Sequence, residues 1–285
     1  MSPIQTCPNC SPSIGTRIVF TLESGIRVLE CRGCGLQFAE VYPEMGEADS
    51  EIYGDPYFAG TIALRPAREK IFAELLEEIE SVSGGKGRLL DVGCGDGMLL
   101  EVAARVGWEV EGTDIATAAV RYARDERGLT VHKGAIEDLS LEPGSYDVVV
   151  LNHSLEHVRN PRATLVRVRE LLRTEGVARI EVPNLSSLSA RVQNLQSRFR
   201  LKKHRWRHYE TGHHFWFFTP RTLSRTIRFA GLSPRGLCAP AAQWGRGNIR
   251  YRATEAFYVM TLWGGHLIAY ARKPSQGSSR DVEVG

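Results

Sequence analysis

A glycine-rich segment at 89–97 carries the residue types whose spacing points most directly to chemistry. It reads Leu-Leu-Asp-Val-Gly-Cys-Gly-Asp-Gly and stands between a β-rich run at 87–92 and a helical pattern at 98–106. Glycines in such a turn let the backbone approach a bound ligand closely. The spacing is Gly-x-Gly-x-Gly, and Met98 stands where a dinucleotide-binding loop would have its third glycine. The segment therefore predicts a nucleotide-like ligand other than NAD.

Acidic side chains narrow the choice of ligand. Asp91 and Asp96 stand inside the loop, and Asp114 ends the next β-rich run roughly 20 residues later. These carboxylates repel a pyrophosphate and attract a cation, and Asp114 can accept hydrogen bonds from both ribose hydroxyls. The alternative for Asp114 alone is a residue at a helix N-terminus. We expect S-adenosylmethionine, which carries a sulfonium and an amino group. The expected contacts are Asp91, Gly93, Cys94, Gly95, Gly97, Asp114 and Ile115.

Four cysteines near the N-terminus form two Cys-x-x-Cys pairs, Cys7 with Cys10 and Cys31 with Cys34. Four thiolates favour a tetrahedral zinc ion with no open coordination position, so the ion would be structural. Between the pairs, β-rich runs at 17–21 and 26–29 flank a turn, which predicts a hairpin. Residues 1–40 are therefore expected to form a zinc ribbon. The alternative is a set of incidental or oxidised cysteines.

The elements that must position these residues alternate along the chain. Helices are expected at 67–82, 98–106, 116–125, 161–172 and 220–230, and strands at 87–92, 109–113, 130–132, 146–151, 178–182, 231–238 and 266–272. This alternation predicts a parallel sheet with helices on both faces. Residues 41–66 would form a linker. The domain at 67–273 would contain a basic and aromatic insertion at 184–218, and 274–285 would be a disordered tail.

Composition excludes several classes of protein. The chain has 285 residues, of which 42% are hydrophobic and 24% charged, as in ordinary globular proteins. Its net charge of +3 excludes a strongly basic nucleic-acid binder on bulk charge. No apolar run approaches the roughly 20 residues of a membrane-spanning helix, and the N-terminus lacks the features of a signal peptide. We expect a cytoplasmic protein without a membrane span, and its oligomeric state stays open.

An ordered set of motifs resembles the class I S-adenosylmethionine-dependent methyltransferases, in particular the small-molecule branch that includes quinone O-methyltransferases. Besides the glycine loop, the matching segments are 112–114, 134–139, 146–158 with its Leu-Glu-His-Val end, 171–176 and 180–184. The resemblance implies an α/β fold with a doubly wound, Rossmann-like sheet of seven strands whose last strand is antiparallel. It also implies cofactor contacts at Ile136, Glu137 and Asn152, although Ala135 stands where many relatives have an acid. The cysteine module resembles the zinc ribbon of bacterial methyltransferases linked to sugar and polysaccharide modification.

Histidines supply the expected proton chemistry, because imidazole is the usual general base near neutral pH. His153, Glu156 and His157 follow the strand at 146–151, at the edge of the sheet where ligands bind in such folds. His213, next to His214, stands in the insertion. The alternative for each histidine is a structural role. Glu156 and His157 could also hold a metal ion, as in some quinone O-methyltransferases.

The insertion is expected to recognise the methyl acceptor. Its basic residues, Arg191, Arg198, Arg200, Lys202, Lys203, Arg205 and Arg207, could clamp a phosphate or carboxylate. Trp206, Phe215, Trp216 and Phe217 could stack on a ring, or they could return the chain to the core. We expect O- or C-methylation of a small metabolite, anionic or sugar-containing. The alternatives are an RNA- or protein-directed methyltransferase and an inactive zinc-ribbon binding module.

Overall fold

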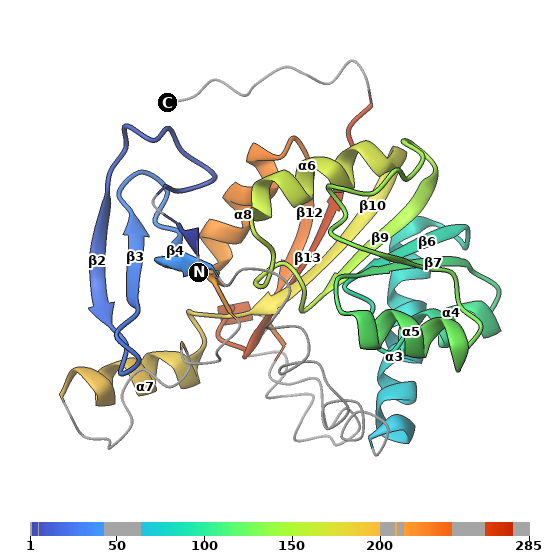
Figure 1. Cartoon of the computed structure of the whole chain (residues 1–285), viewed down its shortest axis with the longest axis horizontal. Coiled ribbons are helices and arrows are strands. Elements are labelled where there is room, and N and C mark those ends of the chain that lie inside the picture. Colours follow the sequence, from blue (N-terminus) through green and yellow to red (C-terminus); the bar gives the residue numbers. More distant parts are fainter. Residues whose placement is uncertain are drawn as a thin grey trace.

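A seven-stranded sheet forms the centre of the structure, a computed structural model that describes residues 2–4, 6–42, 64–199, 209, 214–240 and 260–275 (Figure 1). The strand order is β12-β13-β10-β9-β6-β7-β8. Neighbouring strands from β10 to β8 are parallel, whereas β13 is antiparallel to both β10 and β12. The strands are β6 (Arg88–Val92), β7 (Glu109–Asp114), β8 (Val131–Lys133), β9 (Tyr146–Asn152), β10 (Leu172–Pro183), β12 (Ser233–Cys238) and β13 (His266–Arg272). The predicted fold class is confirmed.

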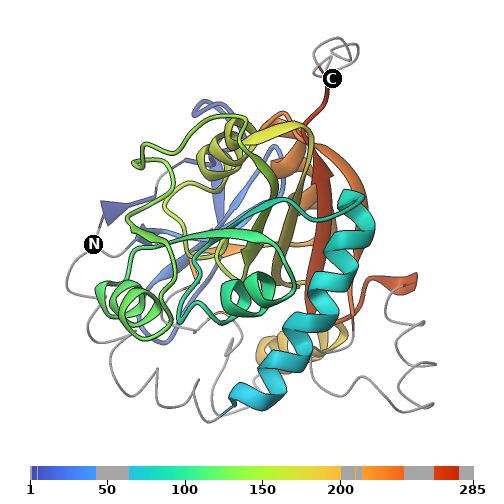
Figure 2. The same ribbon diagram turned by 90° about the vertical axis from the view of Figure 1, so that its right-hand side faces the viewer.

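Helices cover both faces of this sheet. One face packs against α3 (Arg65–Ser83), α4 (Met98–Arg105) and α5 (Thr117–Asp125), and Figure 2 shows α3 lying across it. The other face packs against α6 (Pro161–Leu171) and α8 (Pro220–Phe229), each of which has proline in its first turn. Residues 148–151 of β9 are fully buried, as expected for a parallel strand covered on both sides. The helix α7 (Leu188–Arg198) follows β10.

The N-terminal module is a smaller sheet whose fourth strand comes from far along the chain. The predicted hairpin is confirmed as β2 (Thr16–Thr21) and β3 (Arg27–Cys31), and β4 (Gln37–Ala39) extends it. The strand β11 (Trp216–Phe217) pairs antiparallel with β4, so that Trp216 lies opposite Phe38. Two short strands, β1 (Ser2–Pro3) and β5 (Val41–Tyr42), pair beside this sheet.

The ribbon packs against the large domain through a shared core. Ribbon residues such as Leu36 and Phe38 belong to the same buried cluster as residues of α6 and α8. Polar contacts join the same surfaces: the Asn9 amide donates to Thr226 Oγ1 at 2.7 Å, and Arg225 donates to the Cys34 carbonyl at 3.3 Å. The ribbon of Figure 1 is thus tied to α8 as well as to β11.

Most predicted boundaries agree with the structure to within a few residues. The main difference is β10, which begins at Leu172, directly after α6, and contains an irregularity between Leu172 and Val177. Of the predicted linker and tail, residues 43–63 and 276–285 lie outside the described residues. Within the described segments, no helix combines the length and apolar character required to cross a bilayer.

Candidate active site

The glycine loop joins β6 to α4 and is fixed by the neighbouring strand. The amides of Gly93 and Cys94 both donate to the Thr113 carbonyl, at 2.8 and 3.0 Å. Gly93 and Gly95 have φ values of 77° and 53°, in the left-handed region that favours glycine. A Cβ atom on Gly93 would lie 2.7 Å from Ser154 Cβ, whereas one on Gly95 would meet open space. The loop therefore packs against the segment after β9 and leaves the backbone at Gly95 accessible.

Asp91 and Asp114 face this loop in different environments. Asp91 is 3% exposed, and its Oδ1 has no hydrogen-bond partner in the described chain. Burial raises the pKa of Asp91 to about 7, with Asp114 and Asp96 adding to the rise and Arg179 opposing it. Asp114 accepts from the Gly95 and Ala116 amides, each at 2.8 Å. It therefore fixes the loop and the start of α5 together, in agreement with the interpretation of Asp114 as a residue at a helix N-terminus.

Asp96 does not contribute the free negative charge that the sequence suggested. It is 2% exposed as a side chain and accepts from both terminal nitrogens of Arg68, at 2.8 and 3.0 Å. The Arg127 guanidinium lies 3.6 Å from the same carboxylate. These two cations neutralise Asp96 and tie it to α3, because a buried carboxylate needs a partner. The expectation that the Asp96 carboxylate helps to attract a cationic ligand is therefore corrected.

The other predicted cofactor contacts lie at the ends of β7, β8 and β9. Ile115 follows Asp114 directly. Ile136 belongs to the loop after β8 and is buried. Glu137 accepts a hydrogen bond from Thr164 on α6. Asn152 lies at the end of β9, where its side-chain oxygen is 3.5 Å from Arg179 Nη1. Cys94 is buried, and Gly97 is the N-cap residue directly before α4. All of them therefore border the carboxyl edge of the sheet.

Histidines and carboxylates from β9, β10, β13 and the segment before β11 meet at this edge. We call the set the histidine–glutamate cluster; it consists of His153, Glu156, His157, Glu181, His214 and His266. His153 Nδ1 lies 3.3 Å from Glu156 Oε1, and its Nε2 lies 3.4 Å from Glu181 Oε1. The His153 and His266 rings meet edge to face, with centroids 4.8 Å apart. The predicted trio at 153–157 is therefore half of a larger group.

A second histidine pair, His157 and His214, also lies close to Glu156. His157 Nε2 is 3.8 Å from Glu156 Oε1, and the His157 and His214 rings are 4.7 Å apart. Glu156 is 0% exposed, and its Oε2 has no partner in the described chain. The predicted His213 lies outside the described residues, so His214 is the neighbour that the structure brings to the cluster.

Electrostatics within the cluster follow from these contacts. Burial lowers the pKa of His153, but hydrogen bonds to Glu156 and Glu181 outweigh this effect and raise the pKa to about 10. Burial raises the pKa of Glu181, and contacts with His153 and Arg179 outweigh that effect and hold the pKa well below its usual range. His266 has a lowered pKa because it is buried and lies near His153. The cluster is thus a dense set of opposed charges in a low-dielectric environment.

Sequence reasoning missed Glu181, His266 and the supporting Arg179. Arg179 and Glu181 are 2% and 1% exposed, and their side chains pair at 2.7 Å. One signal was available, because Arg179 and Glu181 interrupt the otherwise apolar stretch 177–183, and ionisable residues in such a stretch are rarely buried without a function or a partner. His266 gave no such signal. Its place beside Pro183 depends on the antiparallel pairing of β13 with β10.

The insertion forms a cavity of about 150 Å³ next to the cluster. It is lined by Pro183, Asn184, Leu185, Ser187, Ser189, Ala190, Gln193, His214, Trp216, Phe217, Phe218 and Gly265. Phe215, Trp216 and Phe217 are between 2% and 9% exposed, and Trp216 packs on Phe38 of the ribbon with centroids 5.4 Å apart. The core interpretation of the aromatic run is therefore correct for these residues, and two of them also line the cavity. Trp206 and residues 200–207 lie outside the described segments.

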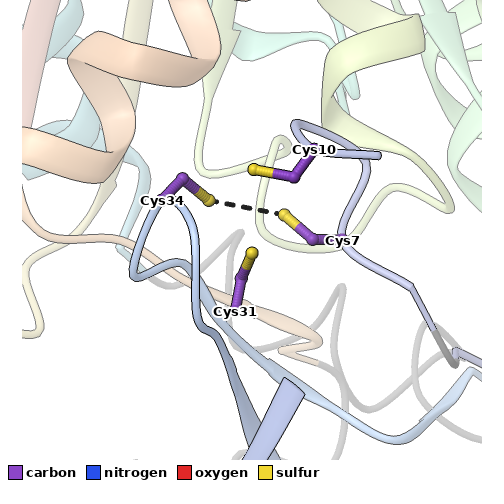
Figure 3. A group of neighbouring side chains, drawn as sticks. All are labelled: Cys7, Cys10, Cys31 and Cys34. Carbon is purple, nitrogen blue, oxygen red and sulfur yellow. Dashed lines mark hydrogen bonds between the residues drawn. The ribbon is translucent and has the colours of Figure 1, made fainter. Parts of the chain in front are cut away.

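The four ribbon cysteines converge, as Figure 3 shows, and we call them the cysteine cluster. Their sulfur atoms all lie within 4.8 Å of one another, and Cys7 Sγ is 3.4 Å from Cys34 Sγ. The hydrogen bond from Cys7 lowers the pKa of Cys34 to about 5. Sulfur atoms bound to one tetrahedral zinc lie about 3.8 Å apart, so the four thiols are grouped on the scale that such an ion requires.

The chain is similar to known methyltransferases in sequence and in fold. The family model described as "Methyltransferase domain" matches residues 64–235. A ubiquinone biosynthesis O-methyltransferase of Xanthomonas euvesicatoria is 31% identical over 221 residues, which cover 74% of this chain and 84% of the relative. One from Cereibacter sphaeroides is 34% identical over 187 residues, covering 62% of this chain and 74% of the relative.

Solved structures agree with this assignment at the level of the fold. A SAM-dependent methyltransferase from Archaeoglobus fulgidus superposes with a TM-score of 0.54 and 22% identity, covering 77% of this chain and 100% of that one. Phosphoethanolamine N-methyltransferase 2 of Haemonchus contortus superposes with a TM-score of 0.58 and 15% identity. The match covers 84% of this chain and 62% of that one. With the glycine loop and the seven-stranded sheet, these matches show that the chain belongs to the class I S-adenosylmethionine-dependent methyltransferases.

Proposed function

We propose that this enzyme transfers the methyl group of S-adenosylmethionine to a hydroxyl oxygen of a small molecule. The observation that carries the proposal is the meeting of the glycine loop with the histidine–glutamate cluster, where Gly93 packs against Ser154 between His153 and Glu156. The named O-methyltransferase relatives support an oxygen acceptor. Transfer is an in-line displacement, so the enzyme chiefly positions two reactants and manages one proton.

Asp91, Gly95 and Asp114 would hold the cofactor. The buried Asp91 Oδ1 lacks a partner, and a cationic ligand beside it would supply one. The open space above Gly95 leaves room for a ligand against the backbone. Asp114 accepts from the Gly95 amide and so orients the loop, and its carboxylate would accept from the ribose hydroxyls. The cofactor supplies the electrophilic methyl group, and these residues fix its direction. Ile115, Ile136, Glu137 and Asn152 would border the adenosine.

His157 is our choice for the general base. Both ring nitrogens of His153 face carboxylates, so neither points to an acceptor. His157 packs on His214, which lines the cavity. The Nε2 atom of His157 lies 3.8 Å from Glu156 Oε1. In this arrangement His157 would accept the proton of the acceptor hydroxyl, whose oxygen would take the methyl group that bound S-adenosylmethionine supplies.

The cavity favours an acceptor that carries hydroxyl groups and a ring. Its described lining offers serine hydroxyls, amides and aromatic faces, but no lysine or arginine side chain. A sugar or phenol ring fits such a mixture of stacking and hydrogen bonding. An anionic group on the acceptor would have to reach the basic residues of the insertion outside this lining. We therefore propose a sugar-containing metabolite, as the sequence predicts, or a phenolic one as the substrate class.

The cysteine cluster would hold one structural zinc ion. Four sulfur ligands leave no open position for substrate, so the ion would stabilise the ribbon rather than react. The fit of the four sulfur atoms supports this assignment.

Methyl-labelled S-adenosylmethionine, incubated with the protein and fractionated cell extract, tests the proposed function. Label in the small-molecule fraction, released by treatment that cleaves methyl ethers, is the expected result. An Asp114→Ala variant provides the matched control, because at cofactor concentrations well below saturation the same extract should then be labelled more slowly. Label in RNA or protein would overturn the acceptor class, and label in a carbon-bound methyl group would overturn oxygen as the acceptor atom.

A further inference from the structure

One wall of the cavity beside the histidine–glutamate cluster belongs to the N-terminal sheet. The lining residues Trp216 and Phe217 form β11, which is a strand of the four-stranded sheet of the ribbon. In the pairing of β11 with β4, Trp216 lies opposite Phe38. Phe217 lies opposite Gln37 in the same pairing. The backbone of this wall is therefore held by a ribbon strand.

Side chains of β4 support the same two aromatic residues. Phe38 is fully buried, and its ring packs against the Trp216 indole with centroids 5.4 Å apart. Gln37 supports Phe217 through Tyr209, whose hydroxyl donates to Gln37 Oε1 at 2.9 Å. The Tyr209 ring meets the Phe217 ring edge to face, with centroids 4.7 Å apart. Because buried side chains are close-packed, loss of Phe38 or Gln37 would release the aromatic residue that it supports.

The same aromatic segment also contacts the loop that carries the proposed base. The Trp216 indole N–H donates to the Val158 carbonyl at 2.7 Å. The Phe215 amide donates to the Glu156 carbonyl at 2.9 Å. His157 stands between these two acceptor residues in the chain. The aromatic segment thus connects the ribbon with the loop after β9, and its position sets the place of the cavity relative to His157.

Phe218, which follows β11, joins this wall to another part of the cavity. Its carbonyl accepts from the Leu185 amide at 2.8 Å. Leu185 lies between β10 and α7, and α7 contributes Ser189, Ala190 and Gln193 to the lining. A change at β4 would therefore reach both the aromatic wall and the helical part of the cavity.

The glycine loop has its own supports within the large domain. The Gly93 and Cys94 amides donate to the Thr113 carbonyl of β7. The Gly95 amide donates to Asp114, at the end of the same strand. Because these contacts join β6 and β7 of the large sheet, we expect a change at β4 to affect the cavity and to spare the cofactor site.

We propose that Phe38 and Gln37 of the ribbon are positioning residues for the methyl acceptor. They hold Trp216 and Phe217 as one wall of the cavity, so the ribbon sets the affinity for the acceptor and leaves the affinity for S-adenosylmethionine unchanged. Under the proposed function, on which this role rests, the acceptor occupies the cavity and contacts this wall. The ribbon then has a part in the active site in addition to the structural role of its cysteine cluster.

Hydrogen–deuterium exchange of the full-length protein tests the support of the cavity by the ribbon without using activity. Phe38→Ala should speed exchange at the Leu185 and Phe215 amides about tenfold, because their acceptors lose a fixed position, while the glycine loop keeps its rate. Leu22→Ala is the matched control, because Leu22 is also buried but follows β2, at the opposite edge of the ribbon sheet from β11. Exchange at Leu185 that is the same in Phe38→Ala and Leu22→Ala would overturn the proposal.

Methyl transfer separates an effect on the acceptor from an effect on the cofactor. The small-molecule fraction of cell extract is titrated as the acceptor, with labelled S-adenosylmethionine in excess. Phe38→Ala should raise the half-saturating amount of this fraction about tenfold, whereas the cofactor affinity by calorimetry should equal that of the wild type. Phe38→Leu keeps apolar bulk beside Trp216 and should recover most of the loss, and Leu22→Ala should match the wild type. An unchanged half-saturating amount in Phe38→Ala, or a parallel loss of cofactor affinity, would overturn the proposal.

Gln37→Ala keeps the test decisive should Phe38→Ala fail to fold. Gln37 is only partly buried, so its truncation leaves no large cavity, yet the Tyr209 hydroxyl loses an acceptor. This variant should raise the half-saturating amount about threefold, and no change would overturn the proposal. Faster exchange at Leu185 in Phe38→Ala, together with no label in the small-molecule fraction for the wild type, would keep the ribbon as a support of the cavity and reject the proposed function.

Discussion

The cysteine cluster brings together thiols and the histidine–glutamate cluster imidazoles and carboxylates, and the chain assembles the two sets in opposite ways. The four cysteines come from two knuckles at the ends of one hairpin, so their convergence is local. The histidines and glutamates come from the ends of β9 and β10, from the start of β13 and from the segment before β11, so the sheet must form first. Spacing in the sequence therefore reports the first kind of site fully and the second kind only in part.

The two regions also differ in how they are partnered. Every cysteine of the ribbon faces the other three, whereas the histidine–glutamate cluster leaves Glu156 Oε2 and His266 Nδ1 without partners in the described chain. A closed ligand set stabilises a fold, and an incomplete one retains capacity for a ligand. We therefore expect a structural role for the cysteine cluster and a chemical role for the histidine–glutamate cluster.

Removing one ribbon ligand should have the largest effect. Cys31→Ser is expected to abolish zinc binding and unfold the ribbon, since zinc contributes about 10–16 kcal/mol to folding in zinc-finger peptides. Zinc content by mass spectrometry and thermal unfolding measure the loss. Cys238→Ser, a cysteine of β12 outside the cluster, should retain the metal. A Cys31→Ser protein with unchanged stability would contradict the structural role.

Replacing the proposed base should reduce catalysis without affecting folding. His157→Gln is expected to lower kcat by about 10²–10⁴-fold, the usual contribution of general base catalysis. Steady-state rates with labelled cofactor measure the change, and cofactor affinity by calorimetry should equal that of the wild type. His132→Gln should keep the full rate. Equal rates in His157→Gln and His132→Gln would show that His157 has a structural role and is not the general base.

Removing the carboxylate that orients the glycine loop should weaken cofactor binding. Asp114→Ala is expected to cost about 1–3 kcal/mol in affinity for S-adenosylmethionine, because the Gly95 amide loses its acceptor and the ribose loses its partner. Calorimetric titration measures the loss, with Glu142→Gln, a largely exposed residue, as control. Unchanged affinity would remove Asp114 from the cofactor site.

Cofactor affinity should depend on pH through Asp91. Its pKa of about 7 means that the buried carboxyl is mostly protonated below pH 7, whereas a cationic cofactor favours the ionised form. Affinity should therefore rise about fivefold between pH 6 and pH 7 as the proton leaves. Asp114 and Asp96 promote protonation and Arg179 opposes it. Titrations across this range should show a flat profile in Asp91→Asn, and an equal slope in both proteins would reject Asp91 as the source.

The smallest effect should come from the joint between ribbon and domain. Asn9→Ala removes the buried hydrogen bond to Thr226 and should cost about 0.5–1.5 kcal/mol of unfolding free energy. Because the two parts share one core, wild type and variant should each unfold in a single transition. Chemical denaturation followed by ribbon and domain fluorescence tests this, and two separate transitions would show that the ribbon is an independent unit.

Much of this architecture could be predicted because its signals are local. The glycine loop, Asp114 and the cysteine pairs stand next to the elements that position them, so chain order alone locates them. Glu181 and His266 could not be paired in advance, because their contact depends on the register between β10 and β13. Asp96 was misinterpreted because its partner Arg68 belongs to α3, well before it in the chain. Contacts between residues far apart in the chain depend on how the strands and helices are arranged, so local sequence patterns do not predict them.

The pairing of β11 with β4 has a consequence for how the chain folds. Phe38 is fully buried against a strand that is synthesised about 180 residues later, so the N-terminal sheet emerges with an open edge and an uncovered aromatic side chain. Such an edge can pair with another chain until its own strand arrives. The ribbon is made first but completed late, and expression of its sequence alone would leave that edge exposed. Fusions and truncations should therefore keep residues 1–42 and 214–240 in one polypeptide.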